Sequence, residues 1–296
     1  MSLPLAWVEV SWRQAGQQAR AALTREPPAL ESPALSLCTC ARVGWLLSGP
    51  RAEAEGRWLA RRVQGAGEVG PVLRFGAEAV RRGLFVSAGL DSAAEGELDI
   101  GRQAIAALDR ARAQHPEGPF ATVEHVLYRL LRRGRRQGWI RARVGVPEAA
   151  AAFALKGGPA SVGLVGAGAM GERASVALTR AGARFSWYNR TPRPGVHGLD
   201  ALAPHPVWIV TTGAPGPWFE PPPGAAAVVD LGQPRQVLPG AGERTPLDAL
   251  LEAAELRLTP GQRALAWEAV DESAQDLISR LRRVSPSTAS ELGVRP

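Results

Sequence analysis

A cysteine followed two residues later by an arginine is the first pair that could do chemistry. Cys40 and Arg42 lie between two short apolar runs, at residues 34–38 and 43–48. A guanidinium at this spacing can stabilise the thiolate, which is the nucleophilic form of cysteine. Most cysteines are small core residues, which is the alternative for this pair and for Cys38. The spacing to Arg42 makes Cys40 a candidate nucleophile.

A glycine-rich turn in the second half of the chain has the spacing of a dinucleotide site. It lies between an apolar run at 161–166 and a helical pattern at 170–181, and reads Gly166-Ala167-Gly168-Ala169-Met170-Gly171. In this context the first glycine permits a tight turn, the second lets the backbone approach a pyrophosphate, and the third allows close helix–strand packing. The helix N-terminus adds the positive end of its dipole. The pattern favours a dinucleotide-binding turn over a glycine-rich turn that binds nothing.

The end of the next apolar run, 184–188, indicates which dinucleotide is bound. It continues into Asn189-Arg190-Thr191 and carries no carboxylate. An NAD site usually has Asp or Glu here to accept the free ribose 2′-hydroxyl, whereas a guanidinium suits a 2′-phosphate. We therefore predict NADPH as the cofactor. The alternative is that Arg190 is only a solvated surface arginine.

These residues need a scaffold, and the pattern of apolar runs predicts one of the α/β class. Further runs at 207–211 and 225–230 alternate with helical or loop segments, which predicts a parallel sheet with helices on its faces. The stretch 213–224 is dense in proline and glycine and predicts a loop. The first half is mixed α+β, with a strand at 4–10 before the two runs around Cys40. Its expected helices are 51–63, 77–85, 101–113 and 122–136.

The length of the chain indicates how many domains this scaffold has. At about 150 residues per domain, 296 residues suggest two domains or one large one. We expect an N-terminal catalytic domain at 1–145, a Rossmann-type NADPH-binding domain at 146–246 that opens on a helix at 146–158, and a C-terminal helix with its tail at 247–296. The helical pattern of this last segment runs from about 246 to 283.

Composition and charge exclude several other classes of protein. Hydrophobic residues make up 45% and charged residues 21%, which excludes a disordered or collagen-like chain. Two cysteines cannot make a disulfide framework, and the four histidines lack metal-ligand spacing, so no metal site is expected. A net charge of +7 permits a polyanionic partner such as RNA, and the arginine-rich run 131–143 is the densest basic segment. Neither a signal peptide nor a spanning helix is evident, so we expect a cytoplasmic protein without membrane contact.

Several short motifs occur in the order in which one known family has them. They are Cys38-Thr39-Cys40-Ala41-Arg42, Gly89-Leu90-Asp91-Ser92 with Gly96-Glu97, the glycine turn, Asn189-Arg190-Thr191, and Asp230-Leu231-Gly232-Gln233-Pro234-Arg235. On these motifs the chain resembles the glutamyl-tRNA reductases, over about residues 8 to 283. The block that begins at Gly89 is the most specific of them, because other Rossmann proteins lack it.

The resemblance implies a reaction in two stages. Cys40 attacks the ester carbonyl of glutamyl-tRNA, and the thioester is then reduced with NADPH to glutamate-1-semialdehyde, the precursor of 5-aminolevulinate and tetrapyrroles. It implies that Thr39, Arg42, Ser92 and Glu97 bind the substrate. It also implies that the next enzyme, glutamate-1-semialdehyde aminomutase, is a partner.

The chain departs from the family at several positions, and these departures leave other interpretations open. Ala41 stands where the family has asparagine, Gly44 where it has glutamate, and Arg82 where it has histidine. The family's dimerisation domain is absent, which predicts a monomer or a weak dimer. A second interpretation is a catalytically degenerate NADPH-binding relative that regulates or scaffolds tetrapyrrole synthesis. A third, a shikimate dehydrogenase, shares Asn-Arg-Thr after the turn but needs a lysine in its first domain, and Lys156 is the only lysine.

Overall fold

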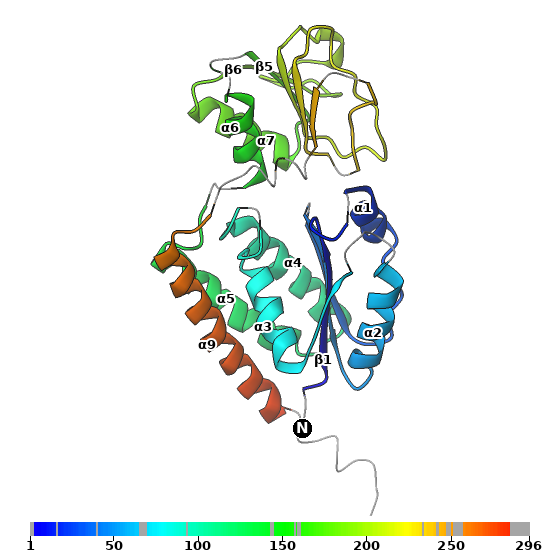
Figure 1. Cartoon of the computed structure of the whole chain (residues 1–296), viewed down its shortest axis with the longest axis vertical. Helices are drawn as coiled ribbons and strands as arrows, with labels where there is room; N and C mark the ends of the chain where they lie inside the picture. Colours follow the sequence, from blue (N-terminus) through cyan, green and yellow to red (C-terminus); the bar gives the residue numbers. More distant parts are fainter. Residues whose placement is uncertain are drawn as a thin grey trace, which may run out of the picture. The chain divides into compact units, whose positions relative to one another are not determined.

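The chain forms two compact units, which are described separately. The computed structural model describes residues 3–15, 17–39, 41–64, 70–92, 94–142, 145–156, 158, 161–232, 234–240, 243–246, 250 and 257–284. The first unit takes the described residues of 1–15, 23–142 and 258–296, and the second takes those of 16–22 and 143–257. An antiparallel sheet lies in the first unit and a parallel sheet in the second, so the expected α/β class is confirmed (Figure 1).

A four-stranded antiparallel sheet of order β2-β3-β1-β4 lies at the centre of the first unit. Its strands are β1 (Leu5–Ser11), β2 (Ala34–Thr39), β3 (Arg42–Ser48) and β4 (Val72–Phe75). Strands β1 and β3 are buried along their whole length, because helices cover both faces. Neighbouring residues of a strand point to opposite faces. Accordingly, Ala6 lies against Gly56 of one covering helix and Trp7 against Gly83 of another.

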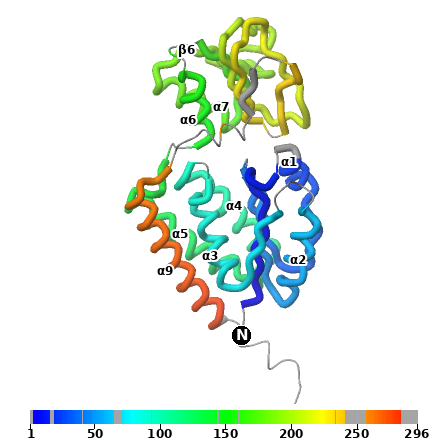
Figure 2. Tube along the Cα trace, viewed as in Figure 1, coloured from blue at the N-terminus to red at the C-terminus, as the bar shows by residue number. Residues whose placement is uncertain are grey.

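The described helices around this sheet are α2 (Ala52–Val63), α3 (Gly76–Ser87), α4 (Leu98–Gln114), α5 (Phe120–Gln137) and α9 (Pro260–Val284). Figure 1 shows α2 on one face and α3 and α4 on the other, with α9 packed outside them against α3 and α5. In Figure 2, α9 (orange to red) runs beside α3 and α5, far from it in the sequence. Its apolar residues recur at helical spacing and join the core of the first unit, as Ala266, Val270, Leu277 and Leu281 do. The expected C-terminal helix therefore packs with the first unit.

The second unit is a five-stranded parallel sheet of order β6-β5-β7-β8-β9. Its elements are α6 (Val146–Ala154), β5 (Ser161–Val165), α7 (Ala169–Arg180), β6 (Arg184–Tyr188), the 3-10 turn η2 (Leu199–Ala201), β7 (Val207–Val210), β8 (Ala227–Asp230) and β9 (Glu243–Pro246). Because β6 lies on one side of β5 and β7 on the other, the strand order reverses between β5 and β7. Ligands of doubly wound sheets bind at the carboxyl ends of the strands at such a point.

Most expected elements are present within a few residues, and the differences have physical causes. Helix α1 (Gln17–Arg25), β4 and β9 were not expected. The two strands have only four residues each, too few to show a period, and the sequence of α1 is mainly polar. The helical pattern expected at about 246–283 is present in part: residue 250 is helical, residues 257–259 are not, and α9 begins at Pro260. Proline is favoured at the first helical position, and the residue before it is disfavoured in helical conformation. Residues 247–249 and 251–256 lie outside the described residues. None of the helices in the described ranges is both long and apolar enough to span a bilayer.

Candidate functional site

The three glycines of the turn after β5 have three different surroundings. Gly166 has a φ of +105°, in the left-handed region, and a Cβ there would lie 2.5 Å from the hydroxyl of Thr211. A Cβ on Gly171 would collide with the Gly166 carbonyl oxygen, whereas one on Gly168 would meet nothing within 4 Å. The indole nitrogen of Trp187, on β6, donates a hydrogen bond of 2.8 Å to the same carbonyl. The turn is thus held against the sheet at both ends and faces open space at Gly168.

A pocket of about 500 Å³ opens beside this turn, at the carboxyl ends of β5 and β7. That volume is in the range of small-molecule and cofactor sites, and the place is the reversal point of the sheet. The lining residues come from the turn, the end of β6 and the loop after β7: Val165, Gly166, Ala167, Gly168, Asn189, Arg190, Thr211, Thr212, Gly213, Ala214, Pro215 and Trp218. Five residues expected to bind the cofactor therefore line one pocket. Ala169, Met170, Gly171 and Thr191 do not line it.

The charge of the pocket comes from one arginine. No aspartate or glutamate lines it, and Arg190 is exposed and has no hydrogen-bond or ion-pair partner among the described residues. The neighbouring Asn189 donates its side-chain amide to the Thr191 carbonyl at 3.0 Å, which fixes the end of β6. Helix α7 begins after Gly168 without a side-chain cap, so its first amides are available to an anion. The pocket is suited to a ligand with phosphate groups.

A fully buried glutamine, Gln236, holds the far wall of the pocket. Its Oε1 accepts hydrogen bonds from Thr212 Oγ1 at 3.0 Å, from the Ala214 amide at 2.9 Å and from Trp218 Nε1 at 3.1 Å. Its Nε2 donates to the Ala214 carbonyl at 2.9 Å. Neither Gln236 nor Trp218 belongs to a motif from which the cofactor site was predicted. The only available signal was the position of Gln236 directly after the motif that ends at Arg235.

Asp230, at the end of β8, holds the loop that carries Gln236. Its buried carboxylate accepts hydrogen bonds from the backbone amides of Gly232, Gln236 and Val237, at 3.0, 2.9 and 3.0 Å. All three bonds are local and to backbone, so Asp230 shapes the loop. The motif that begins with this residue therefore has a structural role in the described part of the chain.

In the first unit, Arg42 brings two of the sequence motifs together. Its side chain is 7% exposed, and Nη2 donates to Asp91 Oδ2 at 2.5 Å and to the Asp91 carbonyl at 3.1 Å. The hydroxyl of Ser92 lies 3.5 Å from a carboxylate oxygen of Glu97, which is buried. Thr39 is the register partner of Arg42 across β2 and β3. The expected substrate-binding residues of the two motifs are therefore linked through Asp91.

Two further charged side chains, Glu9 on β1 and Arg82 on α3, complete this cluster. Glu9 is fully buried and accepts hydrogen bonds from Trp7 Nε1 at 2.6 Å and from Arg82. Arg82 also pairs with Asp91, and Glu9 Oε2 lies 3.7 Å from Arg42 Nε. Each carboxylate thus contacts both arginines, an arrangement that compensates buried charge of both signs.

The cluster shifts the pKa of two of its members, Asp91 and Arg82. Burial opposes ionisation of Asp91, but the charges of Arg42 and Arg82 outweigh it and hold the pKa of Asp91 below its usual 3.8. Burial likewise opposes the charge of Arg82, and Glu9 and Asp91 together overcome it and raise the pKa of Arg82. Arg82, at the position of the family's histidine, is therefore a permanent cation in an ion-pair cluster.

Cys40, the expected nucleophile, lies outside the described residues. Cys38 is on β2, partly buried, with its sulfur 3.6 Å from the hydroxyl of Ser36. Among the residues that the structure describes, no three His, Cys, Asp or Glu side chains gather as a metal site would require.

The fold and the pocket define a mixed α/β chain whose second unit has a Rossmann-like sheet of the nucleotide-binding type. No family model and no curated protein matches the chain. Among solved structures, it is similar to glutamyl-tRNA reductase from Methanopyrus kandleri, with 23% sequence identity and a TM-score of 0.46. The similarity covers 95% of this chain and 80% of that chain.

Proposed function

We propose that the chain reduces glutamyl-tRNA with NADPH to glutamate-1-semialdehyde, through a thioester on Cys40, as the first step towards 5-aminolevulinate and tetrapyrroles. One observation carries the proposal. The two motifs on which the resemblance chiefly rests, around Arg42 and around Ser92, lie far apart in the sequence, and the contact between Arg42 and Asp91 joins them. A purely local likeness of short motifs gives no reason for such a contact.

The pocket of the second unit fits NADPH. The open space at Gly168 admits a pyrophosphate to the backbone, and an acidic lining residue that would repel a 2′-phosphate is lacking among the described residues. Gly166, Ala167 and Gly168 would hold the pyrophosphate, and Asn189 and Arg190 the phosphorylated ribose. Bound NADPH supplies the hydride for the reduction of the thioester.

Cys40 acts as a nucleophile in the first stage of the proposed reaction. Its thiolate attacks the ester carbonyl carbon of glutamyl-tRNA, a carbon–sulfur bond forms, and the carbon–oxygen bond to the terminal ribose breaks. The ribose oxygen takes a proton from solvent water, and the tRNA leaves with a free terminal hydroxyl. In the second stage a hydride adds to the thioester carbonyl, the carbon–sulfur bond breaks, and the aldehyde and the thiolate are released. A thioester accepts hydride more readily than an oxygen ester, which explains the two stages.

Arg42 binds the side-chain carboxylate of the glutamyl group in this proposal. In the structure Arg42 is occupied by Asp91, so the substrate must exchange with that residue. The exchange leaves no charge uncompensated, because Asp91 is also paired with Arg82 and, at 2.8 Å, with Arg13. Thr39, Ser92 and Glu97 then offer hydrogen bonds to the rest of the glutamyl group.

The test compares two acylated RNAs. The chain is mixed with NADPH and either glutamyl-tRNA or glutaminyl-tRNA, and oxidation of NADPH is followed with an aminomutase present to consume the aldehyde. Glutaminyl-tRNA has a neutral amide in place of the carboxylate, so it cannot form an ion pair with Arg42. We expect turnover of glutamyl-tRNA at least about a hundredfold faster, because a site built for a charged group leaves its own charge unpaired with a neutral one. Equal rates would contradict the role of Arg42.

A second function rests on one specific observation. Arg82 replaces the histidine of the family and is fixed between Glu9 and Asp91, so it cannot accept a proton. If a general base is required at that position, the chain is a degenerate NADPH-binding relative that regulates or scaffolds tetrapyrrole synthesis. Tight NADPH binding without NADPH oxidation on either RNA would favour this second function.

The proposal also names partners. The aldehyde product is reactive, which favours transfer to a glutamate-1-semialdehyde aminomutase as the next enzyme. We expect a cytoplasmic monomer or weak dimer, and light scattering at micromolar concentration tests the oligomeric state.

A further inference from the structure

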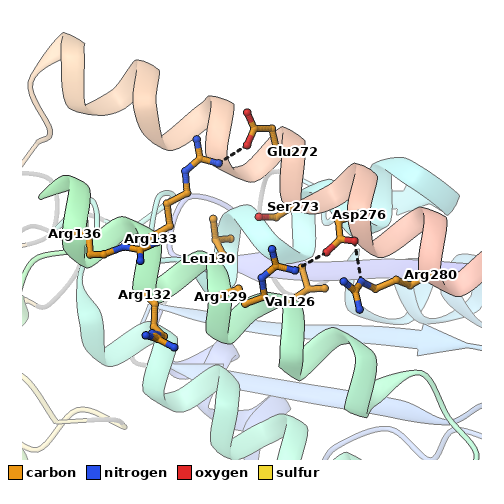
Figure 3. A pocket seen from close by; sticks show the side chains of 10 residues that line it. All are labelled: Val126, Arg129, Leu130, Arg132, Arg133, Arg136, Glu272, Ser273, Asp276 and Arg280. Atoms are coloured by element: carbon orange, nitrogen blue, oxygen red, sulfur yellow. Dashed lines mark hydrogen bonds and ion pairs between the residues drawn. The ribbon is translucent and has the colours of Figure 1, made fainter.

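A groove between α5 and α9 of the first unit gathers arginines that the proposed reaction does not use (Figure 3). Its volume is about 650 Å³. Arg129, Arg132, Arg133 and Arg136 come from α5 and Arg280 comes from α9. The four arginines of α5 are spaced i, i+3, i+4 and i+7, so they lie on one face of the helix.

The groove keeps an excess of positive charge after its internal ion pairs are formed. Glu272 and Asp276 are its only acidic lining residues within the described ranges. Glu272 pairs with Arg133, and Asp276 pairs with Arg129 at 3.3 Å and with Arg280 at 2.8 Å. These pairs are the dashed lines of Figure 3. Five arginines against two carboxylates leave a net positive groove.

Arg132 and Arg136 carry the unmatched charge. Both are exposed, and neither has a hydrogen-bond or ion-pair partner among the described residues. They are four residues apart, so their positions on the helix differ by a rise of about 6 Å. Two free guanidiniums in a row on a rigid helix suit a row of phosphates better than a single anion, since each guanidinium can bond two phosphate oxygens.

An exposed aromatic residue lies next to these charges. A second groove, of about 430 Å³, shares Arg129 and Arg132 with the first and is lined also by His125 and Tyr128. Tyr128 is 56% exposed, the most exposed of the large hydrophobic side chains in the described part of the chain. An open aromatic ring beside a basic groove is the arrangement on which an unpaired nucleic-acid base stacks.

We propose that this face of α5 binds RNA, with Arg132 and Arg136 on the sugar–phosphate backbone and Tyr128 stacked on an unpaired base. An acidic protein segment could also bind the arginines, but its carboxylates would not stack on the exposed ring of Tyr128. The inference deepens the proposed function and rests on it in one respect, namely that the RNA is the substrate tRNA. It assigns the RNA contact to a surface outside the motifs that resemble the family.

The experiment measures binding of unacylated tRNA to the full chain by fluorescence anisotropy over a series of salt concentrations. The test variant is Arg132→Ala/Arg136→Ala. The control is Arg61→Ala/Arg62→Ala, which removes two exposed arginines from α2, on the opposite face of the sheet. Circular dichroism melting establishes that both variants fold.

We expect the test variant to bind tRNA about tenfold more weakly at 0.1 M salt and to lower the slope of log affinity against log salt by roughly 2, or about one per lost phosphate contact. The control should change affinity less than about twofold, because its charges act only through the screened general field. Tyr128→Ala should weaken binding about fivefold or more without a change in slope, and Tyr128→Phe should restore it, since stacking needs the ring and not the hydroxyl.

Equal losses in the two double variants would overturn the inference, as would an unchanged salt slope in the test variant. Polyglutamate binding as tight as tRNA binding, with no effect of Tyr128→Ala, would favour an acidic protein instead. The same measurements distinguish a failure of this inference from a failure of the proposed function. If the test variant binds tRNA normally and glutamyl-tRNA is still reduced, only this inference fails. If tRNA binds through Arg132 and Arg136 but NADPH is never oxidised, only the proposed reaction fails.

Discussion

The contact that joins the two motifs of the first unit can be tested by replacing Asp91 with asparagine. Asp91→Asn keeps the shape of the side chain but removes the charge that faces Arg42 and Arg82. Breaking a fully buried ion pair by removal of one partner costs about 3–5 kcal/mol, and exposed pairs contribute about 0–1 kcal/mol. Asp91 is 17% exposed and Arg42 only 7%, and asparagine retains one acceptor oxygen. We therefore expect the free energy of unfolding of the first unit to fall by about 2–3 kcal/mol.

Urea denaturation at pH 7 measures this loss, with Asp271→Asn as the matched control. Asp271 pairs with Arg81 at 2.7 Å on the surface, where both side chains are more than one third exposed. Its replacement should cost about 0.5 kcal/mol or less. If the two variants lose the same stability, the cluster around Arg42 does not stabilise the fold and the reasoning is wrong.

The pH dependence gives a second check on the same variant. The pKa of Asp91 is lowered in the folded chain, so its stabilisation is complete above its usual value of 3.8 and is lost as pH falls further, through the folded pKa. The difference between parent and Asp91→Asn should therefore be constant near neutral pH and shrink below about pH 3.8. A difference that persists unchanged at lower pH would contradict the ionic origin of the effect.

Three further predictions concern the second unit. Arg190→Asp should abolish or reverse the preference for NADPH over NADH in a binding titration. A carboxylate repels the 2′-phosphate of NADPH and accepts a hydrogen bond from the free 2′-hydroxyl of NADH. Equal affinities for the two cofactors in the parent chain would refute the role of Arg190. Gln236→Leu should cost about 1–2 kcal/mol, since it leaves the partly buried Ala214 amide without an acceptor, and should weaken NADPH binding several-fold in calorimetry. Unaltered binding would show that the far wall is not part of the cofactor site. His205 hydrogen-bonds Ser161 and Tyr188, and burial lowers its pKa. Its contribution to stability is therefore present above pH 6.5 and is lost as pH falls below that value. His205→Gln should remove this part of the pH dependence, and a pH profile of stability identical to that of the parent chain would exclude a role of His205.

The second unit was largely predictable from the sequence because its signals are local. Strands β5 to β8 lie in short, mainly apolar runs that are followed by a turn or a helix, and the glycine spacing fixes the turn at Gly166. Strand β9, with the sequence ERTP, has no such signal. The far wall was not predictable, since the loop that holds Trp218 is rich in proline and its fold depends on the buried amide of Gln236. Local patterns report the elements but not the side chains that a tertiary fold brings between them.

The first unit shows the same limit at Arg42. The sequence indicates a cation beside Cys40, and from it we expected a group ready for the substrate. The structure pairs that cation with Asp91, which lies in a different motif. Likewise, the apolar stripe of α9 predicts that the helix is covered on one side but not by what, and the covering helices α3 and α5 come from the other half of the chain. Partners distant in sequence leave no periodic signal.

Trapping of the acyl-enzyme shows directly whether the reaction passes through a thioester on Cys40. The chain is mixed without NADPH with glutamyl-tRNA labelled in the glutamyl group, quenched in acid, and analysed by mass spectrometry of its peptides. We expect a label on Cys40 that is released by hydroxylamine and disappears on addition of NADPH as glutamate-1-semialdehyde forms. Cys38→Ser should retain most of the label and Cys40→Ser should retain none. A label on Cys38, or none on either cysteine while NADPH is still oxidised, would exclude Cys40 as the nucleophile.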